Sequence, residues 1–123
     1  MAASNFTTWF AYEKGMRLAK CVSQLARNRF PREEKYSLTD QIRRSSRSVC
    51  SNLAESFAKR VYPKHFAAKL TDAMGENYET QVWLQVALNE KYISEEVYQE
   101  YQAASEEVGR LLTFMHQNPH KFT

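Results

Sequence analysis

Glycine and proline are scarce in this sequence, with three of each in 123 residues. Sandwiches, barrels and α/β sheets need frequent turns rich in these residues, so their scarcity argues against such folds. No apolar run approaches the ~20 residues that cross a bilayer, and the N-terminus lacks the basic and apolar blocks of a secretory signal. Cys21 and Cys50 have no metal or redox spacing. We therefore expect a cytoplasmic protein with reduced thiols and no membrane span.

What the sequence does contain is typical of a globular domain. Hydrophobic residues make up 43% and charged residues 25%, and a chain of this length predicts a single domain over residues 1–123. The charge is unevenly spread. Residues 1–60 carry 12 Lys/Arg against 5 Asp/Glu, a net +7, whereas residues 61–123 carry 5 against 9, a net −4. The two halves either pack against each other or leave a basic surface for a polyanion.

Four segments show apolar residues at steps of three and four, the period of an amphipathic helix. Ser37 and Ser94 are the predicted N-caps of the second and fourth segments. The loops between the segments are short, which makes successive helices antiparallel. The sequence therefore predicts an all-α fold, an antiparallel up-down-up-down four-helix bundle. Its helices are expected at about residues 8–29, 38–60, 64–89 and 95–117.

Two apolar features exceed what one small bundle needs. The stretch 82–88 has a single polar residue in seven, and a helix that is apolar all round must be covered on more than one side. We therefore predict a homo-oligomer whose interface includes Val82, Trp83 and Val86. On the last segment a heptad seam is predicted to face the core. Its members are Val97, Tyr101, Ala104, Val108, Leu111 and Met115.

The second segment carries three arginines on the side opposite its apolar stripe. On a helical wheel, Arg43 and Arg47 are one turn apart, and Arg44 lies further round. Two interpretations remain for this group: contact with phosphates, or pairing with acidic residues of a neighbouring subunit. The candidate basic surface is completed by cations of the first segment, namely Lys14, Arg17, Lys20 and Arg27.

Polar residues beside the apolar stripe need hydrogen-bond partners. Asn52, Glu55 and Glu79 are predicted to form a structural interhelical cluster. Bundle di-metal sites use Glu-x-x-His pairs, and none of the three histidines has a Glu three residues before it. No nucleophile–base pair can be assembled either. We therefore predict a protein that is not an enzyme and binds neither metal nor cofactor.

Two runs of the sequence resemble a known family. They are LTDQIRRSSRSVCSNLAESF, followed by Arg60, and LTDAMGENYET. Both are similar to the bacterial four-helix-bundle proteins encoded by intervening sequences in large-subunit ribosomal RNA genes. This chain departs from the family pattern at Ser56, where Gly is usual, and at Gly75-Glu76, where Gly-Ser is usual. The position of the later family glutamate is filled by Glu79.

The resemblance implies a cytoplasmic ring, typically a homopentamer, without established enzymatic activity. Distant relatives are accessory variability proteins of retroelements, in which a basic outer surface contacts nucleic acid and the polymerase. The leading hypothesis is therefore a non-catalytic oligomeric scaffold that binds RNA or DNA, with a nucleic-acid enzyme as a further partner. The alternative is a protein-binding adaptor with no nucleic-acid role, in which the arginines meet acidic residues of a partner.

Overall fold

The computed structural model describes residues 5–123, and all the regular structure in that range is helical. The main elements are α1 (Phe10–Arg29), α2 (Leu38–Ala58), α3 (Pro63–Asn89) and α4 (Glu95–Gln117). Short 3-10 turns lie at Phe6–Thr8, Arg32–Glu34 and Pro119–Lys121. Within this range no helix has both the length and the apolar character needed to span a membrane.

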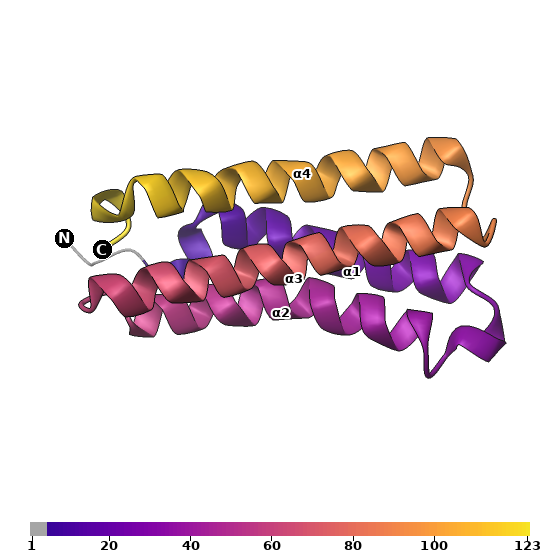
Figure 1. Cartoon of the computed structure of the whole chain (residues 1–123), viewed down its shortest axis with the longest axis horizontal. Helices are drawn as coiled ribbons and strands as arrows, with labels where there is room; N and C mark the ends of the chain where they lie inside the picture. The colour runs from indigo at the N-terminus through magenta and orange to yellow at the C-terminus, as the bar shows by residue number, and fades with distance from the viewer. Residues whose placement is uncertain (1–4) are drawn as a thin grey trace.

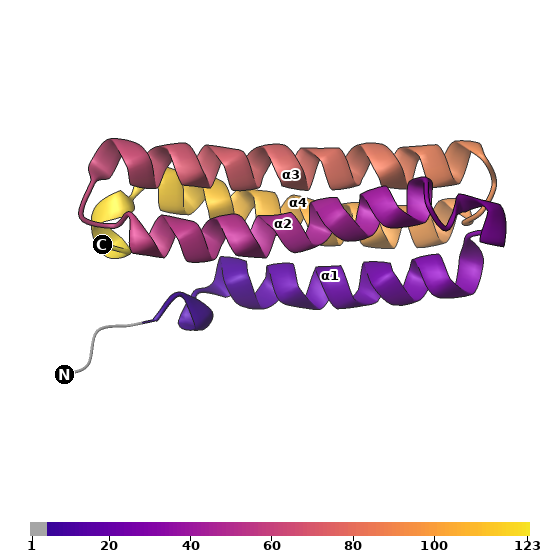
Figure 2. The same cartoon turned by 90° about the horizontal axis from the view of Figure 1, so that it is seen from below.

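Successive helices run in opposite directions, as Figures 1 and 2 show. Helices α1 and α3 each pack against both α2 and α4. The start of α1 and the end of α4 therefore lie at the same end of the molecule (Figure 1). This is the four-helix arrangement that the helical periods and the short loops predict.

The predicted helix boundaries lie within two residues of the observed ones, and the starts of α2 and α4 agree with the prediction. Ser94 caps α4, because its hydroxyl accepts a hydrogen bond from the Val97 N–H at 3.2 Å. Ser37 occupies the N-cap position of α2 but makes no such bond. There the carboxylate of Glu34 accepts from the Leu38 N–H at 3.2 Å, which places an acidic group at the positive end of the helix dipole.

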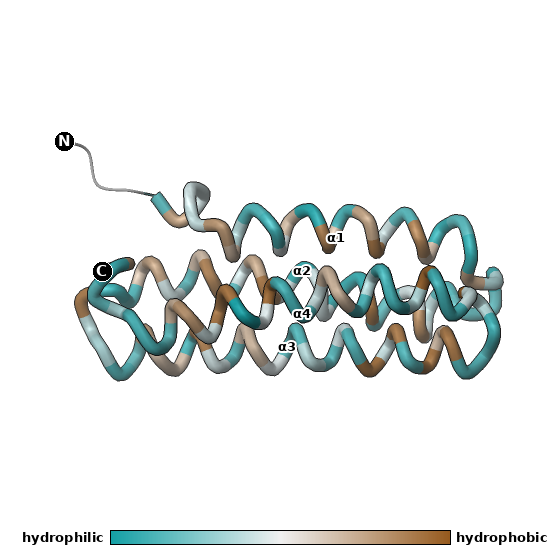
Figure 3. The backbone as a smooth tube through the Cα atoms, turned by 90° about the horizontal axis from the view of Figure 1, so that it is seen from above, coloured by the Kyte–Doolittle hydropathy of each residue, from teal (hydrophilic) through white to brown (hydrophobic). Residues whose placement is uncertain are grey.

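Large apolar side chains from all four helices fill the interior. Figure 3 shows hydrophobic positions recurring along each helix. The fully buried members include Val22, Ile42, Leu53, Phe66, Leu70, Leu84 and Leu112. Trp9 closes one end of this core, with its ring centroid 6.4 Å from that of Phe66 in an edge-on arrangement. Burial of apolar surface on this scale is the main driving force for the fold.

The predicted heptad seam of α4 is correct at some positions and wrong at others. Val108 and Met115 are buried as expected, but Ala104 is exposed and Leu111 only half-buried. The buried positions are instead Ser105 and Leu112. A polar residue such as Ser105 is not expected in an apolar seam, and its burial depends on hydrogen bonds from α3 that the spacing along α4 does not reveal.

Those bonds form a polar ladder between α3 and α4, made of Asn77, Gln81, Gln102 and Ser105. Asn77 Nδ2 donates to the Ser105 carbonyl, and Ser105 Oγ donates to Asn77 Oδ1, both at 2.9 Å. Gln81 Nε2 donates to Ser105 Oγ at 3.0 Å, and Gln102 Nε2 to Gln81 Oε1 at 3.1 Å. A Cβ on Gly109 would lie 3.3 Å from Asn77 Nδ2, so the glycine makes room for this amide.

A second close approach joins α1 and α2. A Cβ on Gly15 would lie 3.1 Å from the Cys50 sulfur, which explains the glycine within α1. Burial raises the pKa of the Cys50 thiol to about 11, so the thiolate is disfavoured at neutral pH. Cys21 is half-buried, and both cysteines are free.

Candidate nucleic-acid interface

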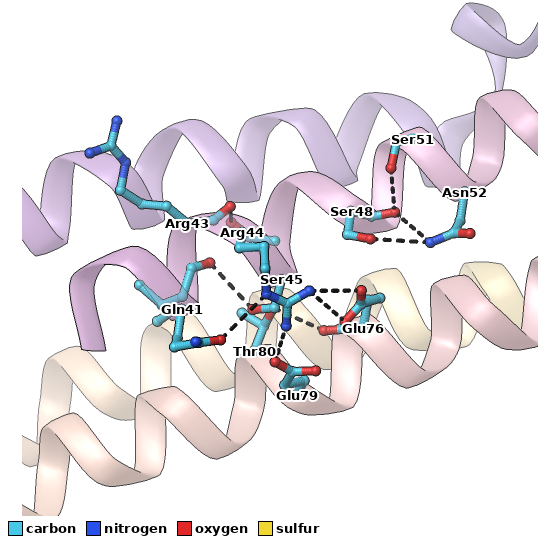
Figure 4. Close-up of polar contacts among 12 residues, drawn as sticks. Gln41, Arg43, Arg44, Ser45, Ser48, Ser51, Asn52, Glu76, Glu79 and Thr80 are labelled. Atoms are coloured by element: carbon cyan, nitrogen blue, oxygen red, sulfur yellow. Dashed lines mark hydrogen bonds and ion pairs between the residues drawn. The ribbon is translucent and has the colours of Figure 1, made fainter. Parts of the chain in front are cut away.

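The three arginines of α2 line one shallow hollow but differ in their partners. Arg44 lies against α3, where its guanidinium bonds to two carboxylates (Figure 4). Its Nη1 lies 3.1 Å from Glu76 Oε2, and its Nη2 pairs with Glu79 Oε1. Arg44 Nε also donates to Gln41 Oε1 at 3.4 Å. Arg44 is thus neutralised inside the chain, and the interpretation as a phosphate ligand does not fit this residue.

The charges in this cluster reinforce each other. Hydrogen bonds to Glu79 and then to Glu76 raise the pKa of the Arg44 guanidinium. Partial burial acts to raise the pKa of Glu76, but hydrogen bonding from Ser48 and Arg44 outweighs it, so the pKa is lowered overall. A carboxyl group with a lowered folded-state pKa stabilises the fold above its unfolded pKa, and this stability is lost as the pH falls through the folded pKa.

Replacing Arg44 by methionine is expected to lower the melting temperature by about 1–4 °C at pH 7, because partly exposed ion pairs contribute modestly. The difference should shrink as the pH falls below the usual glutamate pKa of 4.5 and through the lowered pKa of Glu76 in the folded protein. Thermal unfolding followed by circular dichroism at several pH values measures this. A difference that is constant over the whole pH range would contradict a role for the ion pair.

Arg43 and Arg47 have no carboxylate partner on α3. Together with Asp40, Arg44, Ser48 and Ser51 they line a shallow hollow that is open to solvent. Arg43 points away from the carboxylates of α3 (Figure 4), and its buried Nε has no hydrogen-bond partner. Arg47 is exposed. Over residues 5–123, neither arginine forms an ion pair.

The cations predicted on α1 also divide into two sets. Lys14 pairs with Glu107 of α4 at 3.4 Å, and Arg17 lies 3.9 Å from Glu13. Lys20 and Arg27 are exposed and make no ion pair with the other residues that the structure describes. The structure therefore leaves four of the seven predicted cations unpaired.

The packing of α1 on α2 places these four cations at similar positions along the axis of the bundle. Gly15 faces Cys50 across the two antiparallel helices. Five residues further along α1, Lys20 is therefore level with residue 45, between Arg43 and Arg47. Arg27 is level with the start of α2. We refer to Lys20, Arg27, Arg43 and Arg47 as the basic strip.

Asn52, Glu55 and Glu79 do not form the predicted cluster. Asn52 Nδ2 donates to the Ser48 carbonyl at 2.9 Å within its own helix. Glu55 is exposed and pairs with Lys69 of α3 at 2.9 Å. Glu79 accepts hydrogen bonds from Arg44 and, at 3.3 Å, from the indole N–H of Trp83. Each polar group has a separate hydrogen-bond or ion-pair partner, although Asn52 and Glu79 line the same hollow between α2 and α3.

Ser45 was expected to take part in interhelical hydrogen bonding, but its partner on α3, Thr80, was not predicted from the sequence. The hydroxyl groups of Ser45 and Thr80 lie 2.8 Å apart, and both residues are fully buried. No role was predicted for Glu76 either, although this residue was a departure from the family pattern. A helical wheel of α3 that placed Glu76, Glu79 and Thr80 on the side facing α2 would have indicated both contacts.

The predicted interface residues differ in their exposure. Val82 is 53% exposed, whereas Trp83 and Val86 are partly buried against the core. In residues 5–123 there is also no group of three or more His, Cys, Asp or Glu side chains placed to hold a metal ion.

These features define an antiparallel four-helix bundle with charged side chains on its outer surface. Residues 8–114 match the family described as 23S rRNA-intervening sequence protein, and the chain belongs to this family. A crystal structure of a protein of unknown function, from the S23 ribosomal protein family of Bacteroides thetaiotaomicron, is 25% identical. The TM-score is 0.78, with 87% of this chain and 95% of that chain covered. No curated protein matches the chain.

Proposed function

We propose that this protein is a non-catalytic, self-associating scaffold that binds RNA or another nucleic acid through its basic strip. The observation that carries the proposal is the pair Arg43 and Arg47, which line a hollow open to solvent and have no acidic partner among residues 5–123. Arginine forks match phosphate oxygens in geometry and charge. The neighbouring Ser48 and Ser51 add hydroxyl groups to the same hollow.

Binding of this kind should depend on the phosphate backbone more than on the bases. The strip consists of long, flexible cations on helix surfaces, and the sequence carries no recognised base-reading motif. Weak contacts repeated on each subunit of an assembly would add through their effective concentration. We therefore expect affinity with little sequence preference and a steep dependence on salt.

We expect wild-type binding to single-stranded RNA to weaken by about 50-fold between 50 and 200 mM salt, as four phosphate contacts would require. The double change Arg43→Ala and Arg47→Ala should weaken binding at least about tenfold at low salt and reduce the salt slope by about 1.4. Fluorescence anisotropy with labelled oligonucleotides of several sequences measures both quantities.

A matched control removes two cations elsewhere, with Lys64→Ala and Arg110→Ala. Both residues are exposed and lie outside the basic strip, so this variant should bind nearly as well as the wild type. Equal losses of affinity in the two double variants would mean that binding depends on net charge and not on the basic strip. Affinity that does not change with salt would contradict phosphate binding, and binding of an acidic protein instead would favour the adaptor function.

Self-association is supported by the outward side of α3. Gly75, Tyr78, Val82 and Val86 recur there at steps of three and four, and Tyr78 and Val82 are 64% and 53% exposed. A Cβ on Gly75 would have no atom within 4 Å. A glycine within a helix costs about 1 kcal/mol relative to alanine, and the subunit alone does not require it. Close approach of a helix from a second copy would explain both the glycine and the apolar side chains.

A further inference from the structure

A second hollow lies at the end of the bundle where both α1 begins and α4 ends. Figure 2 shows that the start of α1, the end of α2 and the C-terminal turn meet there. The hollow is lined mainly by aromatic and basic side chains, with Thr8 and Thr123 completing it. None of the side chains lining it within residues 5–123 is an aspartate or a glutamate. This end therefore differs from the basic strip, which has cations but no aromatic ring.

The aromatic part combines one free ring with several packed ones. Phe10 lines the hollow and is 70% exposed. Phe57 and Phe122 line it as well and are partly buried against the core. Phe122 packs edge-on against Trp9, with 6.0 Å between the ring centroids. An exposed phenylalanine costs solvation free energy, and here its ring is held beside a preformed hollow.

The cations are Arg60 and Lys121, and the imidazole of His120 lines the hollow beside them. The Arg60 guanidinium lies 4.1 Å above the Phe57 ring, and its Nη1 donates to the Phe57 carbonyl at 2.9 Å. This fixes the side chain and leaves its remaining N–H groups for a ligand. Lys121 Nζ lies 5.1 Å from the centroid of the Phe114 ring. Among the residues that the structure describes, neither Arg60 nor Lys121 forms an ion pair.

We propose that this hollow binds a nucleotide unit of a single strand, with its base stacked on Phe10 and its phosphate held by Arg60 and Lys121. Aromatic rings beside cations are how proteins hold single-stranded nucleic acids, because every base has a π-face for stacking. A neutral apolar ligand would leave the cations unused, and a free phosphate would not need the exposed ring. The ligand that uses both is a base linked to a phosphate.

This inference rests on the proposed function and extends it. Arg47 and Arg60 lie near opposite ends of the C-terminal part of α2, about 20 Å apart at the helical rise per residue. A strand of about four to eight nucleotides would reach from the basic strip to the hollow. The strip would then bind the backbone, and the hollow would distinguish single strands, whose bases are free to stack, from duplexes.

The test compares an eight-nucleotide oligouridylate with an abasic oligomer of the same length and charge. Phe10→Ala should weaken binding of the oligouridylate by about 5–100-fold, the range for loss of one stacking contact. It should leave binding of the abasic oligomer within about twofold of the wild type. Tyr36→Ala removes an aromatic ring that is 85% exposed in the loop before α2, and this control should change neither affinity.

Trp9 gives an independent measurement, because it also lines the hollow and Trp83 is the only other tryptophan in the chain. In a Trp83→Phe background, saturating oligouridylate should change the Trp9 fluorescence, and the abasic oligomer should not. Equal weakening of both oligomers by Phe10→Ala, or no change in Trp9 fluorescence, would overturn the nucleotide site.

The same experiment separates failure of the site from failure of the proposed function. If Phe10→Ala has no effect while Arg43→Ala with Arg47→Ala abolishes salt-sensitive binding, the basic strip stands and the hollow does not. If the wild-type protein binds neither oligomer at 50 mM salt, both proposals fall.

Discussion

Replacing Phe66 by alanine is expected to lower the free energy of unfolding by about 3–5 kcal/mol, the usual cost of removing a buried phenylalanine side chain. Phe66 is fully buried in α3. Its ring packs against that of Trp9, the residue that precedes α1. The substitution therefore leaves a cavity at the end of the core that Trp9 closes. Chemical denaturation followed by circular dichroism measures the loss. A loss below about 1.5 kcal/mol would mean that the surrounding side chains collapse into the space.

The matched control is Phe10→Ala, the same chemical change at a ring that is 70% exposed. We expect a loss within about 0.5 kcal/mol, as for most surface substitutions. Comparable losses at the two positions would contradict the burial that the structure assigns to them. The control also establishes that Phe10→Ala is folded, which the binding experiment at the end of the bundle requires.

Replacing Val82 by glutamate is expected to weaken self-association by about 100-fold or more, because an unpaired charge would be buried between copies. Val82 is 53% exposed, so the single chain should stay helical. Light scattering at micromolar concentration should then show a wild-type assembly heavier than 14.4 kDa and a variant close to the mass of one chain. Circular dichroism checks that the variant remains folded.

Val61→Glu is the control, since Val61 is 71% exposed between α2 and α3 and lies away from the outward side of α3. It should leave the assembly unchanged. If light scattering shows the wild-type protein as a single 14.4 kDa chain, Gly75 and Val82 do not form an interface between copies. Dissociation by both variants would indicate a general effect of added negative charge.

The four helices could be predicted from the sequence because their causes are local. Apolar spacing, the Ser94 cap and the prolines at helix ends each act within a few residues along the chain. These prolines are Pro31, Pro63 and Pro119. The family resemblance was carried by contiguous motifs in the same way, and the match over residues 8–114 confirms it.

The arginines of the candidate surface could be predicted only as a group, since their roles depend on the neighbouring helices. Arg44 and Arg43 are adjacent in sequence, yet one faces the carboxylates of α3 and the other points away from them (Figure 4). The partner Glu76 lies 32 residues along the chain from Arg44. Which residues pair across two packed helices depends on how far one helix is shifted along the other. Hydrophobic spacing does not determine that shift.

The Glu76 departure from the family pattern has its explanation in the same contact. A serine at this position would leave Arg44 with Glu79 as its carboxylate partner on α3, whereas Glu76 supplies a second one. Arg44 therefore has two carboxylate partners within its own chain. Arg43 and Arg47, which form no ion pair within residues 5–123, are therefore the arginines of α2 that we propose for phosphate contact.

The polar ladder between α3 and α4 determines how far α4 can slide. Moving α4 by one heptad would keep an apolar stripe facing the core, so hydrophobic burial alone discriminates weakly against such a shift. With that shift, Asn77 would face Tyr98 or Leu112 in place of Ser105, and its amide would lose both bonds. The room at Gly109 would be filled by Gln102 or His116. A few buried amides thus select one register of α4 against α3. The positions of the side chains on the outer surface are fixed by the same register.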